Sequence, residues 1–214
     1  MSFRKRIFLL EILLIVCVAV GYFVYKKLET PVAIPEIHGM ILPETRGIAP
    51  FALKQSPDGR AFTERDFSGK WSFLFFGYTH CPDVCPTTMA IMNQIWQLLD
   101  KQNATNDLQV ILISVDPQRD DLKKLGDYVH YFNPNFMGVT GNDAQLNTLA
   151  AQLGIVYEVD AATAQERENY IVNHSAGIIV INPKGEYQAF FSAPHDPSTL
   201  VAEFMQLKNY VQHE

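Results

Sequence analysis

The sequence of 214 residues predicts an α/β domain with a mixed central sheet flanked by helices, preceded by one transmembrane helix. Three observations lead to this fold class. A long apolar run opens the chain, buried-strand patterns then alternate with amphipathic helical patterns, and a turn sequence joins two apolar runs near the end. With 48% hydrophobic and 19% charged residues, the chain suits one membrane segment and one folded domain.

The N-terminal segment predicts a membrane anchor. Residues 7–25 are apolar apart from Glu11, and about 20 apolar residues suffice for a helix to cross the hydrocarbon core. Residues 1–6 form a short basic tail that we expect on the cytoplasmic side, with the rest of the chain translocated. A cleaved signal peptide is the alternative, but no Ala-x-Ala site follows the apolar run.

A proline-rich stretch separates the anchor from the domain. Residues 26–50 show little periodic hydrophobicity and contain four prolines: Pro31, Pro35, Pro43 and Pro50. Proline-rich segments favour extended conformations. We therefore expect a tether over 26–50 and a folded domain over 51–214.

The first half of the domain contains two buried-strand patterns with a helical pattern between them. Trp71–Tyr78 (WSFLFFGY) and Leu108–Val115 (LQVILISV) are largely apolar, as expected of strands covered on both faces. Between them, apolar residues recur at steps of three and four: Met89, Met92, Trp96 and Leu99. This spacing predicts an amphipathic helix that begins near Cys85.

The second half continues the alternation and ends in a hairpin and a helix. The predicted elements are helix 120–132, strand 136–139, helix 142–153, strands 176–181 and 187–191, and helix 200–207. Asn182–Gly185 (NPKG) is a turn sequence between the last two strands, and Ser198 can cap the last helix. This order fits a thioredoxin-like fold with insertions, in which the first long strand leads into the first long helix at Cys81.

The chain has three cysteines, one in the predicted anchor and two in the predicted domain. Cys17 lies in the apolar segment, so Cys81 and Cys85 are the only thiols of the domain. A spacing of four places both sulfurs on one side of a helical turn, close enough to share a metal ion or to form a disulfide. The positive end of a helix favours the thiolate, which binds metals and attacks disulfides. A structural disulfide, a redox-active dithiol and a metal site are the three candidate roles.

A metal site needs at least one more ligand, and His174 is the best placed of the six histidines. It immediately precedes the hairpin, which in this fold can bring it over the start of the first helix. On residue type alone, an ordinary loop histidine is the alternative. Two thiolates and one imidazole suit Cu(I) and are acceptable to Cu(II), whereas structural zinc would need a fourth ligand. Copper is the metal that these residue types favour.

Four segments of the chain resemble the Sco/SenC family. Phe76–Thr88 (FGYTHCPDVCPTT) resembles the signature of that family, and three further segments resemble it in order: Ser114–Asp120 (SVDPQRD), Tyr128–Gly141 (YVHYFNPNFMGVTG) and Tyr170–Ser175 (YIVNHS). The resemblance implies that Cys81, Cys85 and His174 are copper ligands. One departure is Asn173, where the family pattern leads us to expect Asp, so a charge is missing beside the histidine.

The resemblance also implies a role. Sco/SenC proteins are implicated in maturing the binuclear copper centre of cytochrome c oxidase, so we expect a chain that carries copper to the copper-bearing oxidase subunit. The alternative is a thiol-disulfide reductase, in which Cys81 and Cys85 keep the cysteines of the target reduced. We favour a metallochaperone over an enzyme, because a reductant has no evident need for His174.

The sequence and the family resemblance also predict partners, a location and supporting residues. The charge pattern argues against nucleic acid, since the formal net charge is -6 and no basic stripe follows the first six residues. We expect a single-pass protein of the bacterial inner membrane with its domain in the periplasm, where other copper chaperones or thiol reductants are candidate partners; the mitochondrial inner membrane is the alternative. Asp83 and Asp116 are candidates to support the metal ligands. Asp83 equally suits a helix cap, whereas Asp116 better suits fixing, with Arg119, the loop after the second buried strand.

Overall fold

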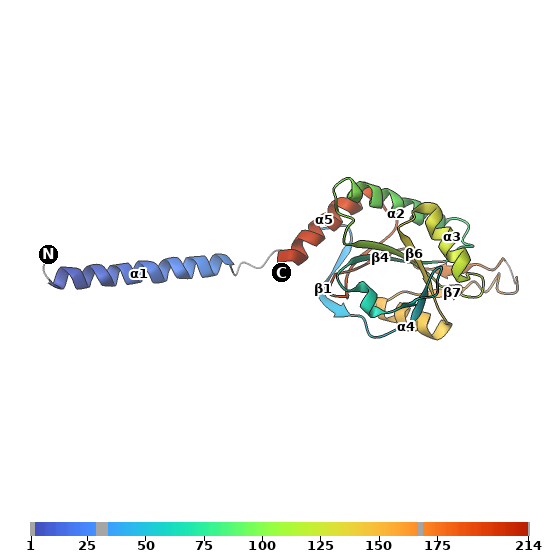
Figure 1. The fold of residues 1–214 in the computed structure, drawn as a ribbon, viewed down its shortest axis with the longest axis horizontal. Coiled ribbons are helices and arrows are strands. Elements are labelled where there is room, and N and C mark those ends of the chain that lie inside the picture. Colours follow the sequence, from blue (N-terminus) through green and yellow to red (C-terminus); the bar gives the residue numbers. More distant parts are fainter. Residues whose placement is uncertain (1–2, 29–33, 167–168, 214) are drawn as a thin grey trace. The chain divides into compact units, whose positions relative to one another are not determined.

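The computed structural model describes residues 3–28, 34–166 and 169–213. One compact unit spans Glu36–Gln206, and helix α1 (Phe3–Leu28) belongs to a second unit. In the Glu36–Gln206 unit, helices α2 (Val84–Asp100) and α3 (Leu122–Phe132) lie on one side of a central sheet, and α4 (Asp143–Leu153) lies on the other side (Figure 1).

The central sheet is mixed. Among the described residues its strands are β1 (Met40–Gly47), β2 (Leu53–Gln55), β3 (Ala61–Phe62), β4 (Trp71–Gly77), β5 (Leu108–Ser114), β6 (Phe136–Thr140), β9 (Ile178–Ile181) and β10 (Glu186–Phe191). They are ordered β1-β10-β9-β4-β5-β6-β2-β3. β4, β5 and β6 run parallel, whereas the other neighbouring pairs are antiparallel.

Two short strands lie apart from this sheet. β7 (Tyr157–Val159) and β8 (Val172–His174) pair with each other in a two-stranded antiparallel sheet, and neither was predicted. A single turn of 3-10 helix, η1 (Glu64–Phe67), precedes β4. The small sheet matters because its second strand ends at His174.

The core explains why β4 and β5 have almost no polar residues. Both strands lie in the middle of the sheet, with every residue buried. Trp71 and Phe73 pack edge-on against Phe204 of helix α5 (Pro197–His213), with ring centroids 5.4 and 4.8 Å apart. Burying one such side chain contributes about 1.5–3 kcal/mol, so these aromatic residues hold the strand that leads to Cys81.

The predicted tether is too long. Residues 40–47 form β1, which pairs antiparallel with β10, and the compact unit begins at Glu36. A register shift between Ile41 and Arg46 accommodates Pro43, because the strand lies at the edge of the sheet and is interrupted there. Residues 29–33 of the predicted tether lie outside the described part of the chain.

The last helix also differs from its prediction. It begins at Pro197 rather than Leu200 and continues to His213. Asp196 accepts a hydrogen bond from the main-chain N–H of Thr199 at 2.8 Å, so Asp196 rather than Ser198 caps the helix. Proline is well suited to the first helical position because its missing N–H would have no partner there.

The predicted hairpin is confirmed. Gly185 donates its main-chain N–H to the carbonyl of Asn182 at 2.9 Å and has a φ of +80°, a conformation that favours glycine. The turn sequence therefore sets the pairing of β9 with β10.

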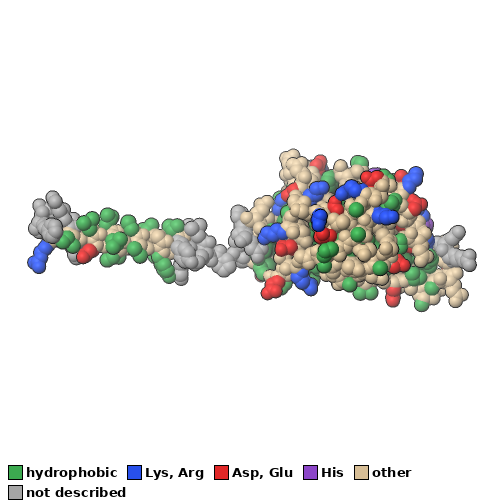
Figure 2. All heavy atoms as spheres, turned by 60° about the horizontal axis from the view of Figure 1, so that its bottom comes forward, with side chains coloured by type: hydrophobic (Ala, Val, Ile, Leu, Met, Phe, Trp, Pro, Cys, Tyr) green, Lys and Arg blue, Asp and Glu red, His purple; other side chains and the backbone are tan. Residues whose placement is uncertain are grey.

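Helix α1 contains the predicted anchor, residues 7–25. Figure 2 shows hydrophobic side chains over this helix, and among the exposed ones are Leu13, Leu14 and Phe23. Within the part of the chain that the structure describes, no helix has the length and apolar character that a membrane crossing requires. The transmembrane helix stays a prediction.

Candidate metal centre

The two cysteines of the domain lie where β4 leads into α2. Cys85 is the second residue of α2, and its main-chain N–H points to the Sγ atom of Cys81 at 3.4 Å. Both thiols are free; Cys85 is fully buried and Cys81 is half-buried. A Cβ atom on Gly77 would lie 2.8 Å from the Cys85 sulfur, so the glycine at the end of β4 makes room for that sulfur.

His174 faces this pair of cysteines from β8. Its Nε2 atom lies 3.2 Å from the Sγ atom of Cys85, and its Nδ1 atom lies 3.1 Å from the carbonyl oxygen of Ser175. A carbonyl can only accept, so Nδ1 is the atom that carries the proton of the neutral ring. The lone pair of Nε2 then faces the thiols, which is the orientation that a ligating imidazole needs.

The three ligand atoms are close enough to bind one ion. The Cys81 and Cys85 sulfurs and a ring nitrogen of His174 all lie within 4.8 Å of one another. The His174 ring is held edge-on by Phe75 and Tyr78, at centroid distances of 5.7 and 6.0 Å. Two sulfurs and one imidazole nitrogen form a soft donor set, which suits copper better than hard cations.

The two thiols have pKa values shifted in opposite directions, so one of them keeps its proton and the other loses it. The hydrogen bond from the Cys85 thiol lowers the pKa of Cys81, and bonds from the main-chain N–H groups of Asp83 and Cys85 lower it further, against the effect of burial. The same bond raises the pKa of Cys85, and burial raises it further. Cys81 is therefore the thiolate and Cys85 the thiol in the metal-free site.

A second cluster lies beside the first. Among the described residues, His80, Asp116 and Asp120 also place ligand atoms within 4.8 Å of one another. The buried carboxylate of Asp120 accepts hydrogen bonds from the Thr79 main-chain N–H at 2.9 Å and from the Ser114 hydroxyl at 2.6 Å. These bonds fix the loop between β4 and α2, so this cluster serves as hydrogen-bonding support.

The two predicted supporting residues behave differently. Asp83 precedes α2 and is exposed, but its side chain makes no capping hydrogen bond, so the cap interpretation is wrong; its main-chain N–H serves Cys81 instead. Asp116 is 3% exposed and bonds both Arg119 and Tyr170. Tyr170 lies four residues before His174, so Asp116 does not contact the candidate ligands but holds the segment that leads to His174.

Sequence reasoning missed Tyr78, Tyr170 and Asp120. The buried hydroxyl of Tyr78 accepts a hydrogen bond from the main-chain N–H of Val172 at 3.2 Å, which ties the end of β4 to the start of β8. All three lie in the segments that resemble the family, and this resemblance is the signal from which their role could have been predicted. Their residue types alone suggested core packing or helix starts.

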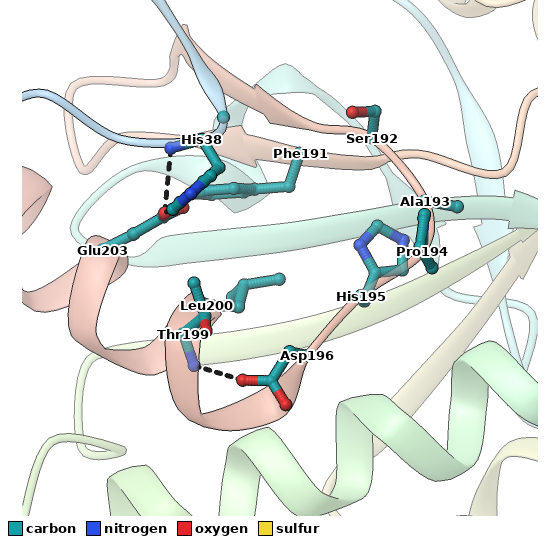
Figure 3. Close-up of a pocket in the computed structure, with 11 residues that line it drawn as sticks. His38, Phe191, Ser192, Ala193, Pro194, His195, Asp196, Thr199, Leu200 and Glu203 are labelled. Carbon is teal, nitrogen blue, oxygen red and sulfur yellow. Dashed lines mark hydrogen bonds and ion pairs between the residues drawn. The ribbon is translucent and has the colours of Figure 1, made fainter.

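One cavity borders the site, and a second is lined by none of the three ligands. One of about 220 Å³ is lined by Cys81, His174 and Ile171 and gives access to the ligands. Figure 3 shows the other, of about 330 Å³, where His38 bonds Glu203 through both its main-chain N–H and its Nδ1 atom, at 2.8 and 2.6 Å. His195 lines this second cavity and donates from Nε2 to the Ala176 carbonyl at 3.1 Å.

Three parallel strands with a dithiol at the first strand–helix junction, followed by an antiparallel hairpin, are the arrangement of a thioredoxin-like domain. An imidazole also faces the dithiol, so the domain carries a candidate metal site made of three side chains. The sequence narrows the class further: residues 42–209 match the family model described as SCO1/SenC, and the chain belongs to that family.

Known relatives agree with this assignment. The chain is 33% identical over 151 residues to the mitochondrial protein SCO1 homolog 1 of Arabidopsis thaliana, covering 71% of this chain and 44% of the relative. It spans about half the length of the mitochondrial relatives it matches. The structure of Arabidopsis thaliana ScoI with copper bound has a TM-score of 0.69 at 31% identity, covering 75% of this chain and 97% of that one. The structure of Bradyrhizobium japonicum ScoI with copper bound has a TM-score of 0.65 at 28% identity. That match covers 77% of this chain and 99% of the other. The predicted family and thioredoxin-like fold are confirmed.

Proposed function

We propose that this chain is a membrane-anchored copper-binding protein that delivers copper to, or prepares, the binuclear copper centre of cytochrome c oxidase. The convergence of Cys81, Cys85 and His174 carries the proposal, because thiolates select Cu(I) and an imidazole also admits Cu(II). The relatives with copper bound support copper as the metal. The Sco family is described as one of cytochrome c oxidase assembly proteins, which supports the oxidase as the destination.

The unequal burial of the ligands suggests how copper is transferred. Cys81 is half-buried and lines the cavity that gives access to the site, whereas Cys85 is fully buried. An incoming thiolate of the copper-bearing oxidase subunit would therefore reach the copper from the Cys81 side. Ligand exchange would then replace the ligands of this chain one at a time.

The location belongs to the same proposal. Residues 7–25 would form a single-pass anchor in the bacterial inner membrane, with residues 1–6 in the cytoplasm and the domain in the periplasm. Other periplasmic copper chaperones or thiol reductants would load or reset the site. Reporter tags placed after Tyr25 should then give a periplasmic signal, whereas a mature protein that starts beyond residue 20 would indicate a cleaved signal peptide.

A thiol-disulfide reductase is the second candidate, and the lowered pKa of Cys81 favours it. The Cys81 thiolate would attack a target disulfide and form a mixed disulfide. Cys85 would then lose its proton, attack Cys81 and release the target as a dithiol. The chain is left with a Cys81–Cys85 disulfide, which a periplasmic thiol reductant must reduce before the next cycle.

The variant His174→Ala separates the two functions. Both thiols remain, so disulfide exchange should persist, while Cu(II) loses its only nitrogen donor and should bind poorly. The delivery function predicts that a His174→Ala strain fails to assemble active oxidase without added copper, and that Cys81→Ser loses both copper binding and disulfide exchange. Normal oxidase assembly in the His174→Ala strain would favour the reductase instead.

A further inference from the structure

The strand that carries His174 has little main-chain connection to the sheet that carries the cysteines. β8 is three residues long and pairs with β7, outside the central sheet. On its C-terminal side, the chain re-enters the central sheet at β9, which begins at Ile178. On its N-terminal side, side-chain contacts must fix the segment that leads to His174.

Tyr170 supplies the first of these contacts. Its hydroxyl donates to the Oδ1 atom of Asp116 at 2.5 Å, across 54 positions in the chain. Asp116 follows β5, and its side chain is 2% exposed. A buried carboxylate needs hydrogen-bond donors on its oxygens, and Tyr170 is one of the donors that satisfies it.

Arg119 completes the group. Its Nε atom donates to the other carboxylate oxygen of Asp116 at 2.5 Å. Its guanidinium carbon lies 3.4 Å from the centre of the Tyr170 ring and 5.5 Å from that of Tyr78. Tyr170 is therefore held by its hydroxyl and by its ring face at once, since a guanidinium stacks on aromatic faces.

Two anchor points result along one short segment. Tyr170 is bound to the loop after β5, and the main-chain N–H of Val172 is bound to the hydroxyl of Tyr78 after β4. These points lie four and two residues before His174. β4 and β5 end side by side, and β4 is followed by the loop with Cys81 and then by α2 with Cys85.

We propose that Tyr170, Asp116 and Arg119 form a clamp that positions His174 against Cys81 and Cys85. They are positioning residues, and the inference rests on the proposed copper function. Their effect should appear in the imidazole–copper interaction and much less in the sulfur–copper interaction, because the cysteines are placed by β4 and α2.

The test uses the full-length reduced chain in detergent, titrated with Cu(II) and separately with Cu(I). Tyr170→Phe keeps the ring over Arg119 and removes the hydroxyl bond to Asp116. We expect the Cu(II) affinity to fall about tenfold or more, as is typical when a group that orients a ligand is lost. The nitrogen coupling in the Cu(II) electron paramagnetic resonance spectrum should weaken, while Cu(I) affinity changes less than about threefold because both thiolates remain.

Tyr157→Phe is the matched control. Tyr157 lies on β7 directly opposite His174, and its hydroxyl donates to the side chain of Asn147 at 2.7 Å. The control removes an equivalent hydroxyl bond from the same small sheet but leaves the clamp intact. Its Cu(II) affinity and nitrogen coupling should match those of the unmodified chain. Equal losses in Tyr170→Phe and Tyr157→Phe would mean a general loosening of the sheet and would overturn the clamp.

Arg119→Lys tests the clamp from its other side. Lysine keeps the charge beside Asp116 but cannot stack a planar group on Tyr170, so the nitrogen coupling should weaken again. Wild-type affinity and coupling in both Tyr170→Phe and Arg119→Lys would refute the clamp while leaving the copper function intact. If instead the unmodified chain binds no copper, or His174→Ala binds Cu(II) as tightly as the unmodified chain, the proposed function itself fails.

Discussion

The Nε2 atom of His174 lies 3.2 Å from the Sγ atom of Cys85, although 89 positions separate the two residues in the chain. The ring presents a lone pair to this sulfur because its Nδ1–H is donated to the Ser175 carbonyl. Cys85 in turn points its thiol towards the Cys81 thiolate. The Ser175 carbonyl thus sets the tautomer of His174, and the bond between the two sulfurs sets which thiol keeps its proton.

Copper binding should release about one proton per ion at neutral pH. The lowered pKa of Cys81 means that this ligand is already a thiolate, and the raised pKa of Cys85 means that this ligand must lose its proton to bind. Calorimetric titrations of the reduced chain in two buffers with different ionisation enthalpies measure the number released. Release of two protons would contradict the unequal division of the proton.

Gly77→Ala should weaken copper binding and destabilise the domain by about 1–3 kcal/mol, the usual cost of overpacking. The added Cβ atom would lie 2.8 Å from the sulfur of Cys85 and displace it. Gly47→Ala is the control, because no atom lies within 4 Å of its added Cβ. Chemical denaturation and copper competition on both variants check the prediction, and equal behaviour of the two would argue against a packing role for Gly77.

A domain fragment that starts at Pro50 should be less stable than one that starts at Glu36. The shorter fragment lacks β1 and therefore exposes the edge of β10. It also loses the buried side chains of Leu42 and Ile48, which contribute about 1.5–3 kcal/mol each. Thermal unfolding of the two fragments measures the difference, and equal midpoints would show that β1 adds nothing to the fold.

His195 should make the folded domain less stable at mildly acidic pH. Burial lowers its pKa below the ordinary 6.5, so the unfolded chain binds its proton more readily than the folded one. The contribution of His195 to the stability of the folded domain is therefore fully present above pH 6.5, the ordinary pKa. That contribution is lost as the pH falls through the lower pKa of the folded state. His195→Gln keeps a donor for the Ala176 carbonyl but does not titrate, so denaturation midpoints should fall less between about pH 7 and pH 5.5. An unchanged dependence on pH would refute this assignment.

Sequence reasoning identified the central elements because their signals are local. β4 and β5 are continuous apolar runs, and the turn at Asn182 has characteristic residues. β1 was missed because an edge strand interrupted by a proline has no local signal; its pairing depends on β10, far along the chain.

Within the candidate metal site, the ligand residues were predictable from the sequence, whereas the contacts that position them were not. Spacing alone indicated the two cysteines, whereas His174 was selected among six histidines with help from the family resemblance. The link from Tyr170 to Asp116 spans 54 positions and leaves no periodic pattern. Contacts of this kind depend on how the elements pack in three dimensions, which no local pattern specifies.

The two halves of the metal site belong to different sheets, with the cysteines at the end of the central sheet and His174 at the end of β8. A central sheet opens only with the whole domain, whereas a pair of three-residue strands opens locally at a much smaller free-energy cost. Local opening of β7 and β8 would remove the imidazole and leave both sulfurs in place. Under the proposed copper function, the same folded chain would offer copper three ligands or two. The strength of the proposed contacts around Tyr170 would then set the balance between a site that retains its ion and one that releases it.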